Sequence, residues 1–135
     1  MGMFDVFDIA GSAMRAQSMR LNVTSSNLAN AENIAGSADA VYRARQAVFS
    51  SHMLNRAAEN TGVRVLGIVE SAAEPMQRFQ PDHPLADDRG FVYATNVNPI
   101  EEMVNMLSAS RSFQSNVEVL NTTKELLLGT LRLGQ

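Results

Sequence analysis

Two rows of apolar residues, one near each end of the chain, repeat at intervals of seven residues. The rows are Phe7, Met14, Leu21 and Leu28 near the N-terminus and Met106, Phe113, Leu120 and Leu127 near the C-terminus. A seven-residue spacing keeps side chains on one face of a helix along its length, so that this face can pack against a second helix. The rows therefore predict two long helices that each need a partner, as in an assembly protein.

The first helix is expected to run from about Asp5 to about Asn33. Asp5 is a good N-cap, and Asn33 and Gly36 favour a turn at the other end. Small residues in this helix would let another backbone approach it closely: Ala10, Gly11, Ser12, Ala13 and Ala16.

The second helix has a well-marked beginning. Asn98 is a good N-cap, Pro99 fits the first helical position, and Glu101 can complete a capping box. The helical pattern continues to about Leu131, and Gly134 favours its end. At about 1.5 Å per residue both helices would be about 45 Å long. They are therefore expected to pair with each other as one antiparallel coiled coil.

The residues between the two helices favour short strands. β-Branched and aromatic residues predict strands at residues 42–49, 63–69 and 91–95. A further short strand is expected at residues 76–79, and the prolines on both sides of it would confine it to the edge of a sheet. Residues 50–61 show no clear period and are expected to form a loop. The expected fold class is α+β, with residues 1–33 and 98–135 forming a discontinuous coiled-coil domain and residues 34–97 a small β-rich insert.

The composition narrows the classes of function. Hydrophobic residues make up 45% of the 135 residues, which argues against disorder, and a net charge of −3 offers no basic patch for nucleic acid. The absence of cysteine excludes disulfides, zinc–thiolate sites and thiol nucleophiles. No apolar stretch approaches the roughly 20 residues that span a bilayer, and the first residues do not resemble a cleaved secretory signal. We expect no nucleic-acid partner and no direct membrane insertion.

One cluster resembles a metal or acid–base site. Asp82, His83 and Asp87 lie close together in the sequence, but Asp and Pro residues favour turns, and one histidine supplies too few ligands for zinc. No Gly-rich phosphate loop or nucleophile motif is present. The sequence thus indicates a protein that is not an enzyme and has no metal or cofactor, with a small hydrolase using these three residues as the alternative.

The two helices alone bury little surface. Fully burying a Leu, Val or Phe is worth about 1.5–3 kcal/mol, against about 1–2 kcal/mol of backbone entropy for each ordered residue. For arms of about 30 residues the balance is close to zero without further contacts. We therefore expect the arms to become fully ordered only when neighbouring copies cover them. The alternative is a stable helical hairpin that packs on its own sheet.

A motif in the first helix has a known counterpart. Residues 25–31 read Ser-Ser-Asn-Leu-Ala-Asn-Ala, which resembles the Asn-Leu-Ala-Asn motif of bacterial flagellar axial proteins, the family of rod, hook and hook-associated subunits. Further blocks are similar to the proximal rod proteins of that family: residues 7–13, 16–18, 20–23, 42–46, 84–87, 102–105, 108–114, 116–122 and 130–135. The similarity covers about residues 4–49 and 81–135, whereas residues 50–80 match only in general character.

This resemblance implies a structural subunit of the flagellar basal-body rod, the shaft that transmits torque from motor to hook and encloses the export channel. It also implies a location in the rod across the periplasm, export by the flagellar type III apparatus without a cleaved signal peptide, and a terminal coiled coil (D0) that lines the channel. The partners would be copies of the chain and neighbouring rod proteins. The alternatives are another rod protein of the family and a soluble coiled-coil export adaptor or chaperone.

The expected assembly interface combines the two apolar rows with the motif. It comprises Phe7, Met14, Leu21, Asn27, Leu28, Ala29, Asn30, Met106, Phe113, Leu120 and Leu127. Asn27 and Asn30 could bond a neighbouring subunit or could be polar residues at a helix end, and the sequence does not decide between these roles.

Overall fold

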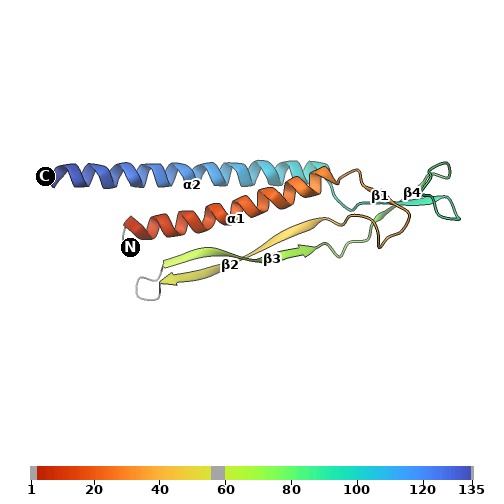
Figure 1. The fold of residues 1–135 in the computed structure, drawn as a ribbon, viewed down its shortest axis with the longest axis horizontal. Helices are drawn as coiled ribbons and strands as arrows, with labels where there is room; N and C mark the ends of the chain where they lie inside the picture. Colours follow the sequence, from red (N-terminus) through yellow and green to blue (C-terminus); the bar gives the residue numbers. More distant parts are fainter. Residues whose placement is uncertain (1–2, 56–59, 135) are drawn as a thin grey trace. The chain divides into compact units, whose positions relative to one another are not determined.

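The computed structural model describes residues 3–55 and 60–134. The elements follow one another as α1 (Met3–Ala29), β1 (Ile34–Ala35), β2 (Arg45–Asn55), β3 (Asn60–Glu70), β4 (Met76–Phe79), β5 (Phe91–Ala94) and α2 (Pro99–Leu133) (Figure 1). Two long helices thus enclose a strand-forming insert in the sequence, which agrees with the expected α+β class.

The first helix differs from its expected bounds at both ends. Because α1 begins at Met3, Asp5 lies in the first helical turn and is not the N-cap. The helix ends at Ala29, where the Asn30 side chain donates to the carbonyl of Ser26 at 2.8 Å and so competes with further helical bonds. With 27 residues in α1 and 35 in α2, the lengths are about 40 and about 52 Å. The expectation of equal lengths is wrong.

The second helix begins as the sequence predicts. Oδ1 of Asn98 accepts a hydrogen bond from the backbone N–H of Ile100 at 3.1 Å, and Pro99 is the first helical residue. The backbone N–H of Glu102 donates to the Asn98 carbonyl at 3.0 Å, which closes the first turn. These contacts confirm Asn98 as the N-cap.

A three-stranded antiparallel sheet has the order β1-β5-β4, so β4 lies at an edge as predicted. Ile34 pairs with Ala94 on one side of β5, and Phe79 pairs with Phe91 on the other. The two phenylalanine rings meet edge to face at 5.3 Å. The two-residue strand β1 was not predicted, because it is too short to show a period.

The second sheet consists of β2 and β3, which together form a long hairpin (Figure 1). Residues 50–55 and 60–61 are strand, so the loop expected over residues 50–61 is wrong there, while residues 56–59 lie outside the described residues. The alternation of apolar and polar residues does not predict the full length of β3. Asn60 is polar and Gly62 is small, yet both occupy buried positions of the strand, whereas apolar Leu66 is exposed.

The chain divides into two compact units, and each helix contributes to both. We call residues 1–21, 47–67 and 107–135 the helix–hairpin unit, and residues 22–46 and 68–106 the sheet unit. The buried residues of the sheet unit include Val41, Val92, Ala94 and Val97.

In the helix–hairpin unit the buried positions found in the described parts of the helices carry small side chains: Ala10, Ser12, Ala16, Ala109 and Thr123. Oγ of Ser12 donates to the carbonyl of Ile9 at 2.7 Å and accepts from the backbone N–H of Val63 at 3.0 Å. A Cβ built on Gly62 would lie 2.7 Å from this oxygen. The close backbone approach predicted for the small residues of the first helix is therefore confirmed at Ser12, and the approaching backbone is β3.

Candidate assembly interface

Asn27 of the flagellar-like motif lies at the centre of a buried polar network in the sheet unit. Its side chain is 1% exposed. Nδ2 donates to the carbonyl of Arg45 at 2.8 Å and to Oε2 of Glu102 at 3.1 Å, and Oδ1 accepts from the hydroxyl of Tyr42 and from the backbone N–H of Arg45, both at 2.9 Å. The network thus joins α1, the start of β2 and the start of α2.

Tyr42 and Arg45 extend this network toward the surface. The Tyr42 hydroxyl lies 3.3 Å from Oγ of Ser26, and the Arg45 guanidinium lies over the Tyr42 ring at 5.5 Å from its centre. Arg45 also pairs with Glu70 at 3.1 Å. Both side chains of this pair are about half exposed, so the pair contributes at most about 1 kcal/mol. The buried amide, not the ion pair, is the main stabilising contact.

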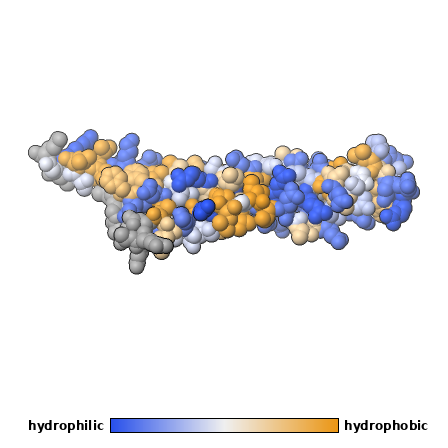
Figure 2. Space-filling view, turned by 60° about the horizontal axis from the view of Figure 1, so that its bottom comes forward, coloured by the Kyte–Doolittle hydropathy of each residue, from blue (hydrophilic) through white to orange (hydrophobic). Residues whose placement is uncertain are grey.

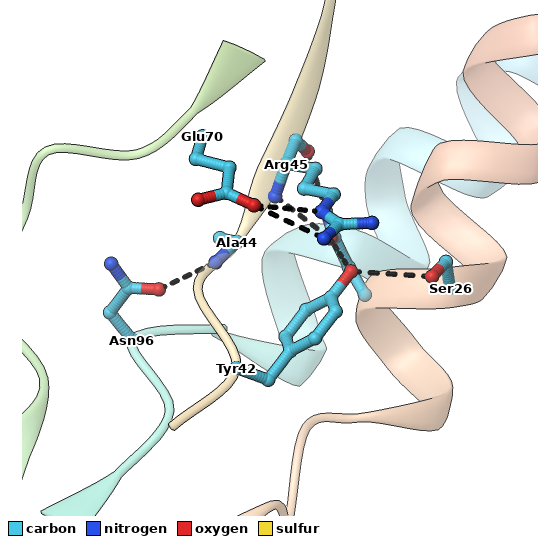
Figure 3. A network of polar contacts seen from close by, with 7 residues as sticks. Ser26, Tyr42, Ala44, Arg45, Glu70 and Asn96 are labelled. Atoms are coloured by element: carbon cyan, nitrogen blue, oxygen red, sulfur yellow. Dashed lines mark hydrogen bonds and ion pairs between the residues drawn. The ribbon is translucent and has the colours of Figure 1, made fainter. Parts of the chain in front are cut away.

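A second asparagine holds the chain just before β2. Oδ1 of Asn96 accepts from the backbone N–H of Ala44 at 2.7 Å, and its Nδ2 donates to the carbonyl of Ala73 at 2.9 Å (Figure 3). The carbonyl of Ala44 accepts from the backbone N–H of Ser71 at 2.7 Å. The entry into β2 and the exit from β3 are therefore fixed together.

These contacts favour a role for Asn27 within its own chain over a bond to a neighbouring subunit. An asparagine amide has two donor hydrogens and two acceptor positions, and all four are used within the chain. No capacity remains for bonding a neighbouring subunit. Asn30 likewise donates to its own helix, Leu28 is half-buried and Ala29 is exposed.

The apolar rows occupy an intermediate position between core and surface. All eight residues are half-buried: Phe7, Met14, Leu21, Leu28, Met106, Phe113, Leu120 and Leu127. Beside them, α2 exposes large apolar side chains, among them Met103, Val104, Leu107, Val119, Leu126, Leu128 and Leu131. Leu126 is 59% exposed and Leu131 is 66% exposed. The chain by itself therefore leaves much of the apolar surface of α2 uncovered.

The hairpin also exposes apolar surface. Figure 2 turns the hairpin side toward the viewer and shows hydrophobic residues at the surface there. Val48, Leu54, Val63 and Leu66 of the hairpin are exposed. Large exposed apolar areas on a protein are typical of surfaces that bind another protein.

The cluster at Asp82, His83 and Asp87 has the geometry of a turn. Nδ1 of His83 accepts from the backbone N–H of Leu85 at 3.1 Å, and Oδ1 of Asp87 accepts from the backbone N–H groups of Phe91 at 2.8 Å and Arg89 at 2.9 Å. The bond from Phe91, with smaller help from Arg89 and Gly90, lowers the pKa of Asp87 below its ordinary value. Among residues 3–55 and 60–134, no three His, Cys, Asp or Glu side chains are grouped so as to hold a metal.

Sequence reasoning did not find Tyr42, Asn96 and Glu102 as partners in the polar networks. Asn27 and Glu102 are 75 positions apart, and no local pattern reports a contact over that distance.

Within the described part of the chain, no helix is both long and apolar enough to cross a bilayer.

Two family models match the chain. The one described as "Flagella basal body rod protein" matches residues 7–32, and "Flagellar basal body rod FlgEFG protein C-terminal" matches residues 88–133. The flagellar basal-body rod proteins FlgC of Yersinia enterocolitica, Escherichia coli O6:H1 and Salmonella typhimurium are 53%, 51% and 50% identical to this chain, in each case over 100% of both sequences. The chain belongs to the FlgC family of flagellar basal-body rod proteins and is a structural subunit of the rod.

Proposed function

We propose that the chain polymerises with copies of itself and with neighbouring rod proteins into the shaft that transmits torque from motor to hook and encloses the export channel. In this proposal it is exported by the flagellar type III apparatus without a cleaved signal and works where the rod crosses the periplasm. Membership of the FlgC family and the resemblance of the motif at residues 25–31 support this.

We further propose that the terminal segments, residues 1–33 and 98–135, form one coiled-coil domain and that residues 34–97 are its β-rich insert. All eight residues of the two heptad rows are half-buried, as residues of a helical seam with one side still open would be. The bond between Asn27 of α1 and Glu102 of α2 gives this pairing a defined register at one point.

The observation that carries the proposal is the exposed apolar surface of α2. Leu107, Val119, Leu126 and Leu131 are each 45% to 66% exposed. Burying a side chain of this size is worth about 1.5–3 kcal/mol, so several neighbouring contacts would stabilise an assembled shaft strongly. Many parallel contacts of this kind would also share the torque, so that no single contact carries the load.

The test is the substitution Leu120→Asp, with Leu120→Met as the volume-conserving control. A charge in the seam should abolish rod assembly and swimming motility, whereas the methionine variant should swim normally. Basal bodies purified from both strains would be probed for the chain, and culture fractions would show whether it leaves the cytoplasm. A fully motile Leu120→Asp strain would refute the seam. A wild-type chain that stays in the cytoplasm would indicate an export chaperone instead.

A further inference from the structure

A groove in the helix–hairpin unit has a positively charged rim. Its volume is about 310 Å³, and it lies between α1 and the two strands of the hairpin. Arg15 and Arg64 line it, and exposed His52 adds a further donor. None of the described residues that line this basic groove is acidic. In a chain with a net charge of −3, a groove of this sign attracts an anionic group.

The rim and the floor of the basic groove define that group. Arg15 and Arg64 are exposed, and no ion pair is found for either of them among residues 3–55 and 60–134. A carboxylate has two oxygens that accept hydrogen bonds, so it can bond two guanidinium groups at once. The floor is apolar, because Leu54, Val63 and Val65 also line the groove. A carboxylate next to an apolar side chain therefore fits it.

The exposed side of α2 carries such a pair. Glu118 and Val119 are both exposed, and no ion pair is found for Glu118 in the described part of the chain. Together with Ser115, Thr122 and Thr123 they line a hollow of about 410 Å³. Because the other residues of this hollow have small side chains, it has room for the aliphatic stems of arginines on a facing surface.

Glu118 points away from the basic groove of its own chain. Ala109 and Thr123 are buried positions of α2 in this unit, which also contains the groove. At 3.6 residues per turn, Glu118 lies about 180° from Ala109 and about 140° from Thr123 around the helix. The groove and Glu118 are thus on different sides of the unit, so two copies that run in the same direction can meet through them side by side. Such a contact joins two different surfaces and can be repeated from copy to copy.

Glu125 is a second exposed acid on α2, but its surroundings differ. Lys124 is exposed beside it and would bring a positive charge toward the two arginines. Around Glu118, residues 114–117 and 119–122 are all uncharged. The local charge therefore favours Glu118.

We propose that the basic groove binds Glu118 of a second copy of this chain, with the carboxylate between Arg15 and Arg64. Val119 of that copy then packs on the apolar floor. The inference rests on the proposed rod assembly and names one lateral contact within it.

Cross-linking in assembled rods tests the contact, since the chain has no cysteine of its own. His52→Cys places a thiol in the basic groove, and Thr122→Cys places one in the hollow beside Glu118. In basal bodies purified from a strain with both substitutions, a short bis-maleimide should join copies of the chain into covalent dimers and longer multimers.

The matched control combines His52→Cys with Thr130→Cys, at another exposed threonine about 12 Å further along α2. It should give at least tenfold fewer multimers. No multimers from the first pair, or as many from the control pair, would overturn the contact. An adduct with a different rod protein in place of the multimers would overturn the choice of a second copy.

Charge exchange tests the role of the charged groups. Glu118→Arg should reduce incorporation of the chain into basal bodies roughly tenfold, as expected for loss of a charge-assisted contact. Adding Arg15→Glu and Arg64→Glu should restore most of it, because the charges are then fully exchanged. All three positions are exposed, so the purified variants should melt at the wild-type temperature. No recovery would overturn the pairing, and recovery with Glu125→Arg in place of Glu118→Arg would overturn the choice of Glu118.

The proposed function can be separated from this contact. If Leu120→Asp still abolishes assembly while the first cysteine pair gives no multimers, the chain is a rod subunit whose basic groove does not bind Glu118.

Discussion

Asn27 and Asn60 are both almost fully buried, and they differ in what their amides contact. Asn27 uses all four of its hydrogen-bonding positions within the sheet unit, whereas no hydrogen-bond partner of the Asn60 side chain is found among residues 3–55 and 60–134. Burial of an amide is tolerated when its bonds to water are replaced, so Asn27 stabilises the single chain. An amide buried without partners costs about 1–3 kcal/mol, so Asn60 contributes less to the stability of the chain than Asn27 does.

Replacing Asn27 by Ala should destabilise the chain by about 3 kcal/mol. The substitution removes four hydrogen bonds and leaves the buried Glu102 carboxylate without this donor. Urea denaturation followed by circular dichroism measures the loss. The matched control is Asn22→Ala, an exposed asparagine of the same helix, which should change the stability little. Equal effects of the two substitutions would contradict the central place of Asn27.

Asp87 should make the stability of its turn depend on pH. Its pKa in the folded chain lies below the ordinary value of 3.8, chiefly because its carboxylate accepts the Phe91 N–H. A lowered folded pKa means that the stabilisation is fully present above the unfolded pKa and is lost as the pH falls through the folded one.

The stability difference between wild type and Asp87→Asn, measured by urea denaturation, should therefore be constant near neutral pH. It should shrink below about pH 4, the unfolded-state value for aspartate. A difference that does not vary between pH 7 and pH 2 would argue against the role of the Asp87 carboxylate.

At the scale of the elements, local periods and caps predicted the two helices, although Asp5 is not the N-cap of α1. The heptad rows predicted both helices, and Asn98 with Pro99 predicted the start of α2 to the residue. The hairpin was predicted only in part, because its close contact with α1 requires small and polar residues at Asn60 and Gly62, where a strand pattern would have apolar ones. The polar network around Asn27 was missed because its partners are distant in the sequence.

Gly62→Ala should disrupt the docking of the hairpin on α1. The added Cβ would lie 2.7 Å from Oγ of Ser12 and 2.9 Å from Cδ1 of Leu54, which is closer than real Cβ contacts allow. Overpacking of this kind costs typically about 1–3 kcal/mol. Hydrogen exchange of the Val63 amide, which donates to Ser12, should become faster.

The control for this substitution lies in the same strand. A Cβ on Gly67 meets no atom within 4 Å, so Gly67→Ala should leave the exchange rate of the Val63 amide unchanged. If the two alanine variants behave alike, the close approach of β3 to Ser12 does not limit the stability of the hairpin.

At the scale of the whole molecule, the half-buried rows and the exposed residues of α2 have different roles. Leu120 and Leu127 belong to the half-buried rows, whereas Leu126 and Leu131 are mostly exposed. Residues of the first kind contribute to the free energy of folding of the single chain. Residues of the second kind can contribute much only when another molecule covers them. Stability and assembly should therefore respond differently to substitutions in the two sets.

Leu126→Gln provides the sharpest test of this division. Because the side chain is 59% exposed, the substitution should change the free energy of unfolding of the purified chain, measured by urea denaturation, by no more than about 0.5 kcal/mol. In cells the same substitution should reduce incorporation into basal bodies, since burying leucine in an assembled contact is worth about 1.5–3 kcal/mol more than burying a polar side chain. Leu120→Gln should instead lower both the free energy of unfolding and the incorporation into basal bodies. Glu125→Gln, at the neighbouring exposed position, should lower neither the stability nor the incorporation. Normal incorporation of the Leu126→Gln chain would mean that this part of α2 stays exposed in the rod.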